Sequence, residues 1–60
     1  MKIECEEDQD DYLELDKYNK TLKVYICEVG NTTRIVLDKA KALQLSTALM
    51  HWFNTGEVLP

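Results

Sequence analysis

The chain has 60 residues, of which 45% are hydrophobic, and it carries a formal net charge of −4. This length allows one small domain, and a core of this size rarely contributes more than about 3–5 kcal/mol of net stability without a disulfide, a metal or oligomerisation. Two cysteines and one histidine form no metal-ligand pattern. The composition therefore excludes a multidomain protein and favours a small globular chain that is stabilised by association.

The charges are unevenly distributed along the chain. Residues 1–16 hold eight acids and one base, a net charge of −7, whereas residues 17–60 hold six bases and three acids, a net charge of +3. We expect residues 1–11 to form an acidic N-terminal arm or a short edge strand, followed by one domain over residues 12–60. The candidate partner-binding residues in this arm are its acids: Glu4, Glu6, Glu7, Asp8, Asp10 and Asp11.

The acidic arm does not match the helix–loop–helix calcium-binding motif. Asp8 and Asp10 have the first spacing of a helix–loop–helix calcium site. That site would next need a Gly and then a Glu at the positions of Leu13 and Asn19. The sequence therefore predicts no metal site, and loose binding of divalent cations is left open.

Three segments with period-two alternation of apolar residues follow the arm. They lie near residues 12–17, 21–29 and 32–37, and they are separated by short runs of turn-forming residues. Consecutive strands joined by short turns pair in antiparallel fashion. The pattern predicts a three-stranded antiparallel meander.

The two turns predict the register of this sheet. A turn at Asn19-Lys20 places Leu15 opposite Val24, and a Gly-first loop at Gly30-Asn31 favours a type II′ hairpin that places Val24 opposite Leu37. Both hairpins assign the same residues to one apolar face, which is the expected core: Leu13, Leu15, Leu22, Val24, Ile26, Ile35 and Leu37.

The opposite face of the sheet mixes aromatic and charged residues. Glu14 and Asp16 share it with a set of residues that forms an alternative contact surface: Tyr12, Tyr25, Lys23 and Arg34.

The last third of the chain predicts one long amphipathic helix. Asp38 is a natural N-cap, no Gly or Pro interrupts residues 39–55, and Gly56 is suited to the C-terminal cap. At about 100° per residue, one stripe of the helix is apolar: Ala42, Leu45, Leu49, Trp52 and Phe53. We expect an α+β fold of β-β-β-α order, with this helix packed on the apolar face of the sheet.

The apolar surface of the helix is wider than one small sheet can cover. Leu43 and Met50 form a second stripe beside the first, and together the stripes span roughly half of the circumference. We therefore predict that Leu43, Met50 and Trp52 contact a second subunit or another partner, most simply in a two-fold homodimer.

The order of three strands and a long helix resembles, in topology only, the family of single-stranded-DNA-binding transcriptional coactivators that dimerise through their helix. The resemblance implies a basic sheet face with aromatic residues on which bases stack. Here the tyrosine-bearing face also carries Glu14 and Asp16 and adjoins the acidic arm. This charge pattern does not favour binding of nucleic acid.

The function is predicted to be binding rather than catalysis. No phosphate loop, zinc-ligand set or hydrolase motif is present, so neither enzyme activity nor a cofactor is expected. With no signal peptide or membrane-spanning run, a cytoplasmic protein is expected. We interpret the chain as an acidic homodimer that modulates or inhibits a larger protein with a basic, nucleic-acid-handling surface, as accessory proteins of phages or mobile elements do. The alternative is a single-stranded nucleic-acid-binding dimer that uses the tyrosine-bearing sheet face.

Overall fold

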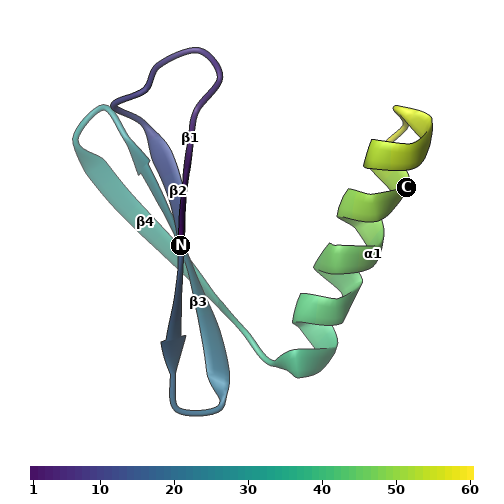
Figure 1. Ribbon diagram of the computed structural model, residues 1–60. Helices are drawn as coiled ribbons and strands as arrows, with labels where there is room; N and C mark the ends of the chain where they lie inside the picture. The colour runs from purple at the N-terminus through teal and green to yellow at the C-terminus, as the bar shows by residue number, and fades with distance from the viewer.

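The computed structural model describes all 60 residues as a four-stranded antiparallel sheet followed by one helix. The strands pair in chain order without a crossover (Figure 1). The α+β class is confirmed, but the sheet has four strands instead of three because residues 2–4 also pair. The elements are β1 (Lys2–Glu4), β2 (Tyr12–Tyr18), β3 (Thr21–Glu28), β4 (Asn31–Leu37) and α1 (Lys39–Thr55).

The β2–β3 hairpin has the predicted register. Leu15 lies opposite Val24 and Leu13 lies opposite Ile26, as the turn at residues 19–20 predicts. Asn19 takes a positive φ of 55° in this turn, which asparagine tolerates better than most residues. Turn chemistry and hydrophobic alternation therefore agree in this hairpin.

The β3–β4 hairpin turns one residue earlier than predicted. Its turn is Val29-Gly30, with φ values of 51° and 78°, instead of Gly30-Asn31. Val24 consequently faces Ile35, not Leu37, so the predicted register was wrong by two residues. Two positive φ values match the type I′ turn, whose twist suits a hairpin. Because the error is two residues, every side chain keeps its predicted face of the sheet.

The helix begins and ends where the sequence predicts. The Asp38 carboxylate accepts a 2.8 Å hydrogen bond from the backbone N–H of Lys41, and this bond lowers the pKa of Asp38 below its usual value of 3.8. At the other end, Gly56 has a φ of 76° and donates its N–H to the Trp52 carbonyl. Both ends of α1 are thus capped by local interactions.

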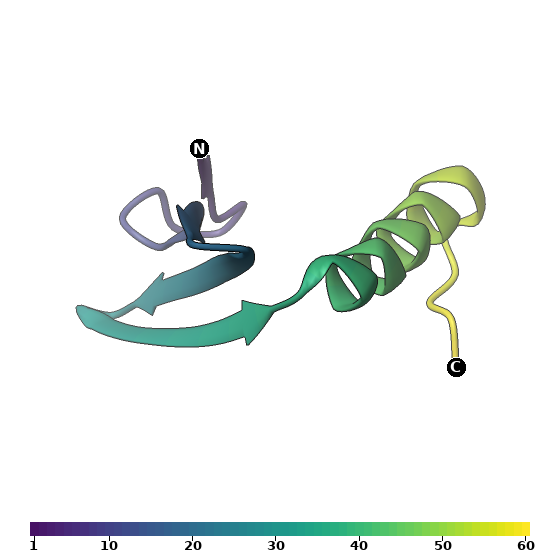
Figure 2. The same cartoon turned by 90° about the horizontal axis from the view of Figure 1, so that it is seen from below.

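The helix does not pack on the sheet, and this part of the prediction was wrong. It leaves the end of β4 and extends away from the sheet in both views (Figures 1 and 2), and none of its residues is buried. The Cα radius of gyration is 12.7 Å, compared with about 10 Å for a compact chain of this length. The physical reason lies in the connection. Asp38 is the one residue between β4 and α1, and its backbone is extended, so the chain has no loop with which to fold back over the sheet.

Candidate interaction surfaces

A single chain buries almost none of the residues that were expected to form its core. Val24 is the one buried residue, at 6% exposure, whereas Ile26 is 50% exposed and Leu49 is 59% exposed. Both of the latter were predicted to be core residues. They are not core in the single chain because the helix that would cover the sheet lies away from it.

The single chain exposes more surface than a compact protein of its mass. The chain exposes 5433 Å², whereas a compact monomer of this mass exposes about 4,000 Å², so the excess is about 1,400 Å². Two apolar surfaces of the single chain lack a covering element. The apolar sheet face comprises Ile3, Leu13, Leu15, Leu22, Val24, Ile26, Ile35 and Leu37. The helix stripe comprises Ala42, Leu45, Leu49, Trp52 and Phe53.

The predicted helix flank is also exposed. Leu43 and Met50 lie on α1 with more than half of their surface accessible, and Trp52 is similarly accessible. The structure does not separate this flank from the helix stripe, since Leu49 and Phe53 are as accessible. Sequence reasoning therefore divided the helix into a core side and a partner side that the single chain does not distinguish.

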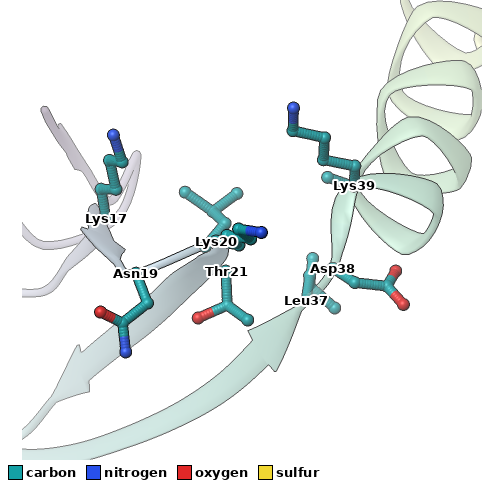
Figure 3. Close-up of a pocket in the computed structure, with 9 residues that line it drawn as sticks. Lys17, Asn19, Lys20, Thr21, Leu37, Asp38 and Lys39 are labelled. Carbon is teal, nitrogen blue, oxygen red and sulfur yellow. The ribbon is translucent and has the colours of Figure 1, made fainter.

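A pocket lies where the helix stripe meets the apolar sheet face. Its volume is about 300 Å³, and its apolar lining is Leu22, Leu37 and Ala42. Lys17 flanks it from β2, Lys20 from the β2–β3 turn and Lys39 from the start of α1. Figure 3 shows the Lys17 and Lys39 side chains extending to the same side, while the Asp38 carboxylate points away from them.

None of these three lysines has an acidic partner. The one ion pair in the structure joins Lys41 to Asp38 at 3.5 Å. We call this site the lysine-rimmed pocket. The sequence analysis missed it, because the three lysines line one pocket only when the β2–β3 hairpin is placed beside the start of the helix.

The acidic residues lie at the other end of the sheet. The loop that joins β1 to β2 sits beside the β3–β4 turn, whereas the β2–β3 turn and the start of α1 lie at the opposite end (Figure 1). The loop is held by hydrogen bonds from Cys5 N to Asp11 O at 2.8 Å and from Val29 N to the Asp11 carboxylate at 3.0 Å. The acidic loop, defined as the remaining predicted acids, is exposed: Glu4, Glu6, Glu7, Asp8 and Asp10.

Asp11 thus differs from the other acids of the arm. It is half-buried and ties the loop to the neighbouring turn, so it has a structural contact that the sequence did not reveal.

The protein has an acidic end and a lysine-rich end. No group of three or more His, Cys, Asp or Glu side chains is placed to hold a metal ion.

The tyrosine-bearing face brings the predicted residues together on β2, β3 and β4. Tyr25 lies opposite Arg34, and Tyr12 lies opposite Cys27. A hydrogen bond with the Cys27 thiol, and the charge of that group when ionised, raise the pKa of Tyr12 above 10.0.

Tyr18 and Lys2 also belong to this face. The Lys23 ammonium lies 4.2 Å from the centroid of the Tyr18 ring, and the Lys2 ammonium lies 4.0 Å from that of Tyr12. Such contacts favour a cation over an aromatic ring. The alternation of side chains along a strand would have placed Tyr18 on this face if β2 had been predicted to end one residue later. It would have placed Lys2 there if β1 had been predicted as a strand.

Comparisons with protein-family models, with curated proteins and with solved structures find no match to this chain. The helix is neither long enough nor apolar enough to cross a lipid bilayer.

Proposed function

We propose that this protein is a non-enzymatic interaction module that acts as a homodimer and docks its acidic end on a larger protein with a basic surface. The observation that carries the proposal is the exposed apolar surface of the single chain, with Val24 as its one buried residue. Exposed apolar patches of this extent are typical of interaction sites.

The amount of excess surface supports a second copy as the partner that covers it. Interfaces of obligate homodimers bury about 2,000–5,000 Å² in total, or about 1,000–2,500 Å² per subunit. The excess of about 1,400 Å² per chain falls within this range. In a two-fold dimer, the helix stripes of the two copies would pack against each other, so the same apolar surface is buried on both copies at once.

The acidic loop supports the second part of the proposal. Its five acids gather at the end of the sheet remote from the lysine-rimmed pocket, so they remain accessible when the helices pair. A concentration of one sign of charge accelerates association with a surface of the opposite sign. A basic protein surface that normally handles nucleic acid is a suitable target, and docking there would modulate or inhibit that protein.

The tyrosine-bearing face supports a second candidate function, binding of single-stranded nucleic acid by the dimer. All three tyrosines of the chain lie on this face, together with Lys2, Lys23 and Arg34. Base stacking on aromatic rings needs such a platform. Three acids on the same face oppose phosphate binding: Glu4, Glu14 and Asp16.

Sedimentation equilibrium tests the dimer directly, and a stable monomer at tens of micromolar concentration would refute it. The basic-surface partner is tested by purifying the protein from its host with its bound partner, and then measuring association rates against salt. E6Q/E7Q should slow association and flatten its salt dependence, because screening acts over about 10 Å at 0.1 M salt. The matched control E14Q/D16N removes the same charge from the tyrosine-bearing face. If E6Q/E7Q leaves the rate of partner binding unchanged, and a single-stranded oligonucleotide binds with strong salt dependence and more tightly to E14Q/D16N, the second candidate function is favoured.

A further inference from the structure

The lysine-rimmed pocket has the character of a binding site for an acidic, apolar segment. Its lining by Leu22, Leu37 and Ala42 offers apolar contact, and three lysines without acidic partners surround it. A segment that fits must place aliphatic side chains on the lining and a carboxylate among the ammonium groups. Such a segment would neutralise charge that the single chain leaves uncompensated.

The chain itself contains a segment with this chemistry. Glu57 is the one acidic residue after Asp38, and Val58 and Leu59 follow it directly. Val58 is 79% exposed, so its aliphatic side chain has no cover in the single chain. The segment 57–59 follows the αL cap at Gly56, which ends the helix and frees the chain to change direction.

This segment cannot reach the pocket of its own chain. The pocket lies at the first turn of α1, and a helix of 17 residues is about 25 Å long. The stretch from Gly56 to Leu59 spans at most about 14 Å when extended. Figure 1 shows the C-terminus near the last turns of α1, whereas the pocket lies at the first turn.

A second copy places the segment correctly. When two α1 helices pair along their helix stripes in antiparallel fashion, with the two-fold axis at the midpoint of the helix, the end of each helix lies beside the start of the other. The segment that follows Gly56 of one copy then arrives at the first turn of its partner, where the pocket is. The same arrangement buries the helix stripe, which needs a partner in any case.

We propose that segment 57–59 of each copy occupies the lysine-rimmed pocket of the other, with Glu57 among Lys17, Lys20 and Lys39 and with Val58 and Leu59 on the apolar lining. The inference rests on the proposed homodimer and specifies its orientation as antiparallel. By symmetry, each dimer contains two such sites.

Charge reversal tests the inference. E57K and K20E/K39E should each raise the dimer Kd about tenfold, because attraction becomes repulsion at two symmetric, solvent-accessible sites. E14K makes the same charge change as E57K on the tyrosine-bearing face of β2, away from the pocket, and its Kd should stay within about threefold of the unmodified protein. An equal mixture of E57K and K20E/K39E should form heterodimers with nearly unmodified affinity, since each reversed segment then meets a reversed pocket.

Several results would overturn the inference. An E57K dimer as stable as the E14K dimer would do so, as would a mixture that associates no better than its components. An unmodified protein that is monomeric would overturn the homodimer and the inference together, whereas an unmodified dimer without rescue would overturn the inference alone. Carbodiimide crosslinking of mixed isotopically heavy and light unmodified protein needs no variant. It should join Glu57 to Lys17, Lys20 or Lys39 of the other isotope, and crosslinks confined to one isotope would contradict docking between copies.

Discussion

The sheet and the helix of this protein are stabilised in different ways. The sheet joins residues far apart in the chain through three antiparallel pairings, and these gather a small core around Val24. The helix has good caps at Asp38 and Gly56 but no buried residue. An isolated helix of this length is marginal in water, because its propensity and caps barely offset the cost of nucleation. The comparison teaches that local caps are the main support of the helix in the single chain, whereas the sheet is also supported by strand pairing and by one buried residue.

Placing a charge in the helix stripe should produce the largest effect. In the proposed dimer, Leu49→Asp buries an unpaired carboxylate, which is expected to cost about 3–5 kcal/mol of dimer stability. Sedimentation should show dissociation, and circular dichroism should show a loss of helical signal. Gln44→Asp, on the opposite side of α1, is the control and should leave the dimer intact. An unchanged L49D dimer would mean that the helix stripe is not the interface.

Truncating the one buried residue should cost more stability than truncating a residue on the other face of the sheet. Val24→Ala leaves a cavity at the centre of the sheet and is expected to cost about 2 kcal/mol. Val36→Ala removes the same atoms from an exposed position on the tyrosine-bearing face and should cost about 0.5 kcal/mol or less. Urea denaturation measures both values, and equal losses would contradict the assignment of the core to Val24.

The β3–β4 turn should become more stable when its strain is removed. Val29 is β-branched, holds a φ of 51° and is 81% exposed, so it gains little from its apolar side chain. Val29→Asn creates an Asn-Gly turn, the preferred type I′ pair, and should raise the free energy of unfolding by about 1 kcal/mol. Thermal denaturation at fixed protein concentration checks this. A lower melting temperature for V29N would show that Val29 has a contact outside the turn.

The N-cap should make the helix sensitive to acid. The folded-state pKa of Asp38 lies below its usual value of 3.8, so its stabilising contribution is present above that pH and is lost as the pH falls through the folded-state pKa. Asp38→Asn keeps a capping oxygen without the charge and should reduce this acid sensitivity, whereas Asp38→Ala should reduce helix stability at neutral pH as well. Helical signal against pH distinguishes the three proteins. Identical acid profiles for D38N and the unmodified protein would assign the sensitivity to other acids.

Neutralising the acidic loop should have the smallest effect on folding. The side chains of Glu6, Glu7 and Asp10 are exposed and make no hydrogen bond or ion pair in the structure. E6Q/E7Q/D10N should therefore leave stability unchanged or slightly raised, because mutual repulsion is relieved. Asp11→Ala should instead cost about 1 kcal/mol, since it removes the acceptor for Val29 N–H. Equal stabilities for D11A and the triple variant would show that this hydrogen bond contributes nothing.

Local chemistry made several features predictable from the sequence. The caps of α1, the register of the β2–β3 hairpin and the face of every strand residue depend on neighbouring residues and on the period of two. Even the misplaced turn at residues 29–30 preserved the faces, because a shift of two residues does not change them. The turn contains Val29 instead of Asn31, although asparagine is preferred over valine at a turn position. The hydrogen bond from Val29 N–H to Asp11, 18 residues earlier, could not be predicted from the alternation of apolar residues.

The sequence by itself thus determined which elements form and which of their sides are apolar. Only the tertiary structure decided that β1 joins the sheet, that Asp11 ties the acidic loop to a distant turn, and that α1 lies away from the sheet. The physical reason is that amphipathic patterning specifies a surface to be covered without specifying what covers it. With one residue between β4 and α1, the helix does not cover the sheet of its own chain, and three lysines are brought around an open apolar pocket.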